Sequence, residues 1–162
     1  MNQPPRNPKE PLLNRKLVTK AFLWYGLLGS IASTISYFFV NIQNGWPSIP
    51  LAGELDPVYV KATTMALAAI VFSQIGAVFN CRTEKQSAFK VGLLSNKQVN
   101  FGIIFEIILI AALVYLPPLQ TIFHTAPLDV TDWLLLCIWP PLILLIEEAR
   151  KAFLRKKSGK DY

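Results

Sequence analysis

Long apolar runs with few charges alternate with short polar segments along this sequence. Each run is about twenty residues long, which is enough for a helix to cross a hydrocarbon core of about 30 Å. The pattern therefore predicts an all-α membrane protein built as a four-helix transmembrane bundle. The predicted spans are residues 21–42, 62–81, 99–116 and 133–153.

Polar segments flank this predicted four-span domain of residues 21–153, and prolines punctuate it. Residues 1–20 form a proline-rich amino-terminal segment, and residues 154–162 form a basic tail. Pro117 and Pro118 end the third run, because proline cannot continue a helix. Pro140 and Pro141 lie in the middle of the fourth run, where they are predicted to kink the helix while neighbouring helices satisfy the freed carbonyl groups.

The basic residues lie almost entirely on one side of the predicted membrane. Fifteen of the sixteen Lys and Arg residues fall before the first run, between the second and third runs, or in and after the last turn of the fourth. Lys61 alone falls in the other loops. Because cytoplasmic loops carry the excess of Lys and Arg, this distribution predicts that both termini are cytoplasmic.

Composition supports a membrane protein and argues against several soluble classes. The chain is 52% apolar and 16% charged, whereas soluble domains are near one quarter charged. The net charge of +6 is divided among separate blocks, which does not favour a nucleic-acid partner. No phosphate-binding GxxxxGK[ST] or GxGxxG pattern occurs in the sequence.

Two polar residues inside the apolar runs are candidates for binding a cation. Glu106 interrupts the third run, and an acid within a membrane span is costly enough that a functional role is the default interpretation. Gln74, beside Ser73 in the second run, offers a neutral oxygen suited to hard cations. The alternatives are that Glu106 is a protonated or hydrogen-bonded packing residue and that Gln74 only bonds a neighbouring helix.

Other residues are more easily explained by packing and anchoring. Glu147 and Glu148 precede Arg150 and Lys151, a spacing that predicts helical ion pairs with side chains reaching the membrane surface. The first run has a face of small residues, which predicts close contact with another helix. That face comprises Gly26, Gly29, Ser30, Ser33 and Ser36.

Several short motifs occur in order along nearly the whole chain. They are residues 1–12, 64–67, 79–84, 92–96, 118–120, 122–128 and 132–134. Together they resemble the carboxy-terminal membrane region of P-type cation ATPases. The opening MNQPPRNPKEPL resembles the cytoplasmic segment between the sixth and seventh helices of these pumps. The motifs from 64 to 96 resemble the eighth helix and the loop after it, and those from 118 to 134 resemble the loop between the ninth and tenth helices.

The resemblance implies that the four spans are the seventh to tenth helices of such a pump. Gln74 would then match a cation-ligand position, which is a carboxylate in calcium pumps and a glutamine in sodium-potassium pumps. Ala77 stands where relatives often carry Asp or Asn, so a second ligand from this helix is not expected. Glu106 resembles the ninth-helix acid that sodium-potassium pumps link to a third cation site or a proton path.

The sequence and the resemblance together lead us to expect a transport-domain fragment of a cation pump that supports cation translocation. The phosphorylation motif DKTGT is absent from the sequence, so we expect no ATP hydrolysis by this chain alone and no cofactor other than a transported cation. Expected partners are the lipid bilayer, most simply the cell membrane, and the remaining part of a pump. Because Met1 matches an internal methionine of full-length relatives, a truncated or split gene is a further hypothesis.

The alternative is a free-standing tetraspan protein, acting either as a structural or regulatory partner or as a small proton-coupled transporter. Small multidrug exporters have a similar number of spans but place their essential acid in the first helix. The first run here carries no charge. That difference disfavours the exporter.

Overall fold

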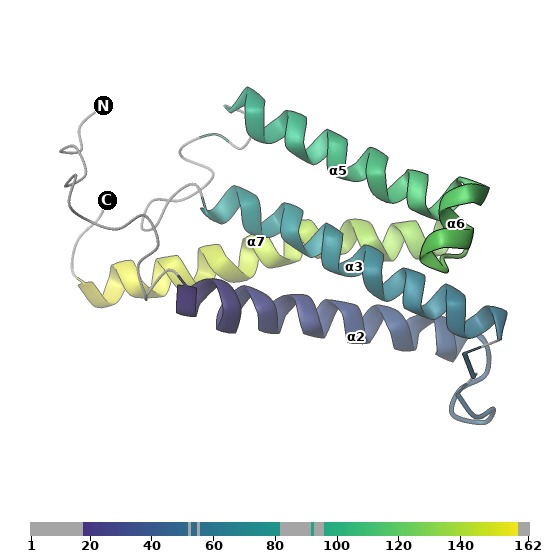
Figure 1. Cartoon of the computed structure of the whole chain (residues 1–162). Coiled ribbons are helices and arrows are strands. Elements are labelled where there is room, and N and C mark those ends of the chain that lie inside the picture. The colour runs from purple at the N-terminus through teal and green to yellow at the C-terminus, as the bar shows by residue number, and fades with distance from the viewer. Residues whose placement is uncertain (1–17, 52, 55, 82–91, 93–95, 159–162) are drawn as a thin grey trace.

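Four long helices run side by side in the computed structural model, which describes residues 18–51, 53, 54, 56–81, 92 and 96–158 (Figure 1). They are α2 (Gly26–Gln43), α3 (Pro57–Cys81), α5 (Lys97–Tyr115) and α7 (Val130–Ser158). A π-helical turn, η1 (Lys20–Tyr25), leads into α2, and a short helix, α6 (Pro117–Phe123), lies between α5 and α7. Each of the four long helices is long and apolar enough to cross a membrane. The predicted all-α, four-helix class is confirmed.

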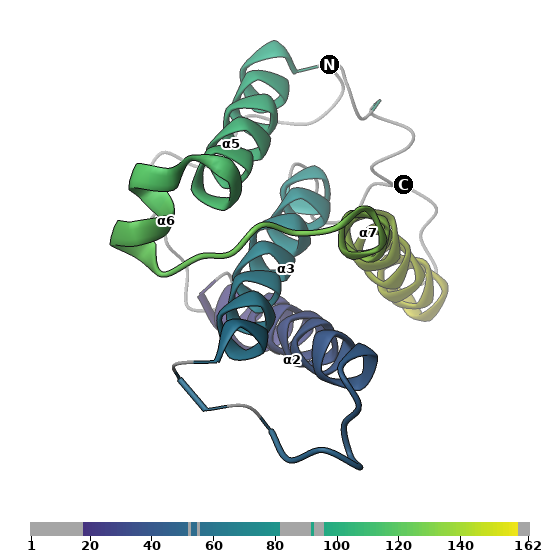
Figure 2. The same ribbon diagram turned by 90° about the vertical axis from the view of Figure 1, so that its right-hand side faces the viewer.

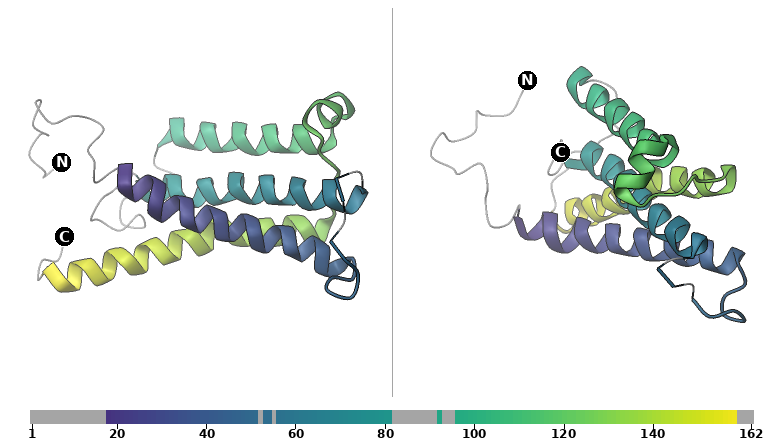
Figure 3. Two further views of the ribbon diagram at one scale, coloured as in Figure 1. Left: turned by 60° about the horizontal axis from the view of Figure 1, so that its bottom comes forward. Right: turned by 45° about the vertical axis from the view of Figure 1, so that its right-hand side comes forward.

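The ends of the helices alternate between the two ends of the bundle. The beginning of α2, the end of α3, the beginning of α5 and the end of α7 lie together, and α6 lies at the opposite end (Figures 1 and 3). This is the arrangement that the distribution of basic residues requires. We call the first end inner and the second outer, following the charge distribution, and the cytoplasmic side itself stays a prediction.

Helix α3 is the centre of the bundle. It packs against both α2 and α7, while α5 stands further out on the other side of α3 (Figure 2). Half of the most apolar stretch of α3 is buried, compared with 11% of that of α5. The core around α3 combines four alanines with larger apolar side chains. The alanines matter because small residues let membrane helices approach closely. The core residues are Ala32, Val40, Ala62, Met65, Ala68, Ala69, Phe72, Ile110, Val114, Leu128, Leu136 and Trp139.

Part of the predicted small-residue face of α2 packs inside this bundle. A Cβ atom added to Gly29 would lie 3.3 Å from the Ser73 hydroxyl oxygen of α3. Ser36 is fully buried and accepts a 3.0 Å hydrogen bond from the Trp139 Nε1 of α7. The small residues therefore bring α2 against both of its neighbours.

The closest approach between α3 and α7 is at Gly76. A Cβ atom at this position would lie 2.5 Å from the Pro140 carbonyl oxygen and 3.1 Å from the Pro140 Cα. Helix α7 continues through Pro140 and Pro141 as one helix. Because only a hydrogen fits between the two backbones, the glycine sets the distance between α3 and α7.

Side-chain capping and a proline pair determine where α5 begins and ends. Asn96 caps it by accepting hydrogen bonds from the Gln98 and Val99 amides at 3.0 and 3.3 Å. It ends at Tyr115, before the proline pair, as predicted. The short helix α6 was not predicted from the sequence, and its first positions are these same prolines.

Candidate functional site

A groove with a volume of about 480 Å³ lies between α2 and α3, and Gln74 is on its wall. Its lining is mostly small and hydroxylated. Besides Gln74, the lining residues are Tyr25, Gly26, Gly29, Ser30, Ser33, Thr34, Ile70 and Ser73. Four of the five residues of the small-residue face of α2 therefore line this groove, namely Gly26, Gly29, Ser30 and Ser33.

The polar groups of the groove are neutral, and some are already engaged. Ser30 donates a 2.9 Å hydrogen bond to the Gly26 carbonyl, and Ser73 donates one of 2.7 Å to the Ile70 carbonyl. Gln74 is exposed at the groove. Hydroxyl and amide oxygens can act as ligands of a hard cation. Because the described residues of the lining include no carboxylate, they cannot by themselves neutralise the charge of an ion.

Glu106 is half-buried on α5 and is not among the residues that line this groove. The two sequence-predicted site residues are therefore on different helices and are not brought together in the groove. Within the described part of the chain, no cluster of three or more His, Cys, Asp or Glu residues could hold a metal ion. A cation site that used Gln74 would need carboxylates from elsewhere.

A buried carboxylate at the inner end of the bundle was not recognised as buried from the sequence. Glu147 is fully buried and accepts a 2.9 Å hydrogen bond from the Trp24 Nε1 of η1. The Arg150 guanidinium, three residues on, donates two hydrogen bonds of 2.7 Å to its two oxygens. The predicted helical ion pair is present, but it also ties α7 to the beginning of the first span.

Lys151 is also buried rather than extended to the membrane surface. It is 1% exposed, and its ammonium donates a 3.1 Å hydrogen bond to the Asn80 carbonyl near the end of α3. Glu148 lies 3.6 Å from it as an ion-pair partner. The expectation that Lys151 snorkels is wrong, because the end of α3 offers an acceptor within the bundle. No sequence spacing shows a contact between residues 71 positions apart.

The outer end is held by a second ionic cluster. The Lys61 ammonium of α3 lies 2.6 Å from an Asp129 oxygen and 2.9 Å from an Asp132 oxygen. Asp132 is fully buried in the first turn of α7. The Thr64 hydroxyl accepts a 2.9 Å hydrogen bond from the Ala126 amide. Thr64 thus fixes the outer loop to α3 and is not part of the groove.

We expect Lys61→Met to lower the free energy of unfolding by about 1–3 kcal/mol, because the buried Asp132 carboxylate would lose its cationic partner. Hydrogen exchange of the amides from Ala126 to Asp132 should accelerate at the same time. Lys97→Met at the exposed first position of α5 serves as the control. Equal exchange in the two variants would show that the cluster does not hold the loop.

Comparison with known proteins decides the family. The sequence profile described as "Cation transporting ATPase, C-terminus" matches residues 1–153. This chain belongs to that family of P-type cation ATPases. Membership agrees with the resemblance drawn from the motifs, and together with the four apolar helices it makes the chain a multi-pass membrane protein.

Relatives in the family are cation pumps that are much longer than this chain. The sodium/potassium-transporting ATPase subunit alpha-4 of Rattus norvegicus is 29% identical over 98% of this chain and 18% of its own length. Calcium-transporting ATPase 1 of Schizosaccharomyces pombe is 30% identical over 98% and 16%. Calcium-transporting ATPase type 2C member 2 of Mus musculus is 27% identical over 93% and 15%. The chain therefore spans less than a fifth of the length of these relatives.

Proposed function

We propose that this chain is the carboxy-terminal part of the membrane transport unit of an ATP-driven cation pump, in the cell membrane. Gln74 lends one side-chain oxygen to a cation site, and Glu106 offers a carboxylate to a neighbouring ion or a proton. The observation that carries the proposal is the groove between α2 and α3, where Gln74 is exposed among neutral oxygens.

The neutrality of the groove also explains why the chain would work only as part of a larger pump. Neutral oxygens alone leave the charge of a bound ion uncompensated in a medium of low dielectric constant. The carboxylates that complete the site, and the phosphorylated aspartate with its nucleotide-binding domain, would come from the remaining part of the pump. By this proposal the chain alone neither transports cations nor hydrolyses ATP.

Gln74→Ala in a complete pump that carries this chain as its carboxy-terminal part should weaken the apparent affinity for the transported cation. The loss of one oxygen ligand should cost about five- to thirtyfold, which corresponds to about 1–2 kcal/mol. The measurement is ATP-dependent cation uptake into vesicles as a function of cation concentration, with Na⁺ and Ca²⁺ tested separately. Gln43→Ala is the matched control, because Gln43 is an exposed glutamine at the outer end of α2.

The two site residues are tested separately. Unchanged cation affinity in Gln74→Ala would show that Gln74 is not a cation ligand. Glu106→Gln should alter the number of ions carried per ATP or the pH dependence of transport if the Glu106 carboxylate takes part. Stable expression and activity of the chain without any other pump helices would contradict the proposed function as a whole and favour a free-standing tetraspan protein.

A further inference from the structure

The inner end of α7 extends beyond the part of the helix that is needed to cross a membrane. Its 29 residues span about 44 Å, whereas the hydrocarbon core is about 30 Å thick. Trp133 near its outer end donates a 2.7 Å hydrogen bond to the Tyr115 hydroxyl, an aromatic pair typical of the membrane interface. About twenty residues from Trp133 reach Ala152. Residues 153–158 therefore leave the hydrocarbon core at the inner surface.

The charge of this extension is not balanced by acids in its own segment. Arg150 and Lys151, just before it, are paired with Glu147 and Glu148. After Lys151 the sequence contains four basic residues and no acid before Asp161. These basic residues are Arg155, Lys156, Lys157 and Lys160.

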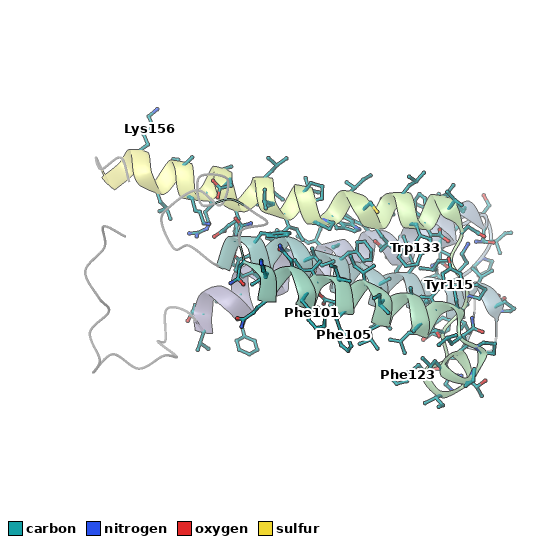
Figure 4. All side chains as sticks on the ribbon, turned by 90° about the horizontal axis from the view of Figure 1, so that it is seen from above. Phe101, Phe105, Tyr115, Phe123, Trp133 and Lys156 are labelled. Atoms are coloured by element: carbon teal, nitrogen blue, oxygen red, sulfur yellow. The ribbon has the colours of Figure 1, made fainter. Side chains whose placement is uncertain are left out.

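Two apolar side chains at the start of the extension are exposed. Phe153 is 69% exposed and Leu154 is 46% exposed. Lys156 is exposed three residues after Phe153, so the two lie on the same side of the helix. Figure 4 shows Lys156 directed away from the other helices. The extension thus exposes two apolar side chains, Phe153 and Leu154, next to the positive charge of Lys156.

We propose that this inner extension of α7 binds the headgroups of anionic phospholipids. Phe153 and Leu154 lie at the level where acyl chains meet headgroups, while the exposed Lys156 ammonium beyond them faces the phosphate layer. The exposed apolar residues favour a membrane surface over an acidic segment of protein, because a soluble acidic partner would leave them in water. Clusters of basic residues directly after a membrane span attract anionic lipids in this way.

The test compares lipid selectivity between charge variants of the full chain. The chain is reconstituted in phosphatidylcholine vesicles with a minor fraction of phosphatidylglycerol, and the preference for spin-labelled phosphatidylglycerol over phosphatidylcholine is measured by electron spin resonance. The double substitution Lys156→Gln with Lys157→Gln should reduce this preference by about fivefold for each cation removed. The substitutions Arg6→Gln with Lys9→Gln remove the same charge from the amino-terminal segment, outside the sequence of α7, and serve as the control.

Three outcomes would overturn the proposal. An unchanged preference in the α7 variant would show that its cations do not select lipid. An equal reduction in the control would show that only net charge matters. No preference for phosphatidylglycerol in the parent chain at low salt would leave an acidic protein segment as the occupant. Circular dichroism of each variant checks that the helices are retained, and a preference that falls at high salt supports the proposal.

Discussion

Valine in place of Gly76 should force α3 and α7 apart and lower the free energy of unfolding by about 3 kcal/mol or more. The added Cβ would lie 2.5 Å from the Pro140 carbonyl oxygen, a backbone atom that cannot move aside by changing a rotamer. Gly76→Ala should already be destabilising, and the two methyl groups that valine carries on its Cβ should add to the loss. The measurement is unfolding of the full chain in mixed micelles, followed by circular dichroism.

Gly102→Val is the matched control for this prediction. Gly102 is also in a helix interior, but nothing lies within 4 Å of a Cβ added there. Both substitutions change helix propensity in the same way, so their difference reports the contact with α7. Equal losses of stability would mean that α7 moves away from α3 at no cost and would refute the tight contact.

Removal of the Glu147 carboxylate is the second change from which we expect a large effect. Glu147→Ala should cost about 3–5 kcal/mol, because a buried ion pair loses one partner and the other charge stays behind. The indole of Trp24 loses its acceptor in the same step. The beginning of the first span should then fray, and the tryptophan emission spectrum should change together with the stability.

Glu54→Ala is the control for the Glu147 substitution, because Glu54 is an exposed carboxylate in the segment between α2 and α3. A double-mutant cycle with Trp24→Phe isolates the contact between η1 and α7. If Trp24→Phe and Glu147→Ala are strictly additive, the hydrogen bond between them does not stabilise the bundle.

The helices and their alternation followed from the sequence, because the bilayer imposes a strong rule. A membrane span needs about twenty apolar residues, and its charged neighbours report its direction. Asn96 and the proline pair at 117 and 118 place the ends of α5 by local chemistry alone. The helix α6 escaped prediction because the same prolines that end one helix are favoured in the first turn of another.

The contacts between helices were less accessible to sequence reasoning. Nothing in the local pattern around Glu147 or Lys151 distinguishes a surface ion pair from a buried one, since their decisive partners are Trp24 and Asn80 on other helices. The candidate site was located only in part. Gln74 could be singled out as a polar residue in an apolar run, but the groove beside it depends on how α2 packs against α3.

The pairing of Lys61 with Asp129 and Asp132 has an electrical consequence for the whole chain. On the outer side, one basic and four acidic residues leave a charge of −3, and the basic residue is itself neutralised by contact. On the inner side, fifteen basic and five acidic residues leave +10, and Glu106 within the span accounts for the rest of the net +6. A membrane potential that is negative inside contributes about 2.3 kcal/mol per charge per 100 mV. An energised membrane therefore holds this bundle in its predicted orientation.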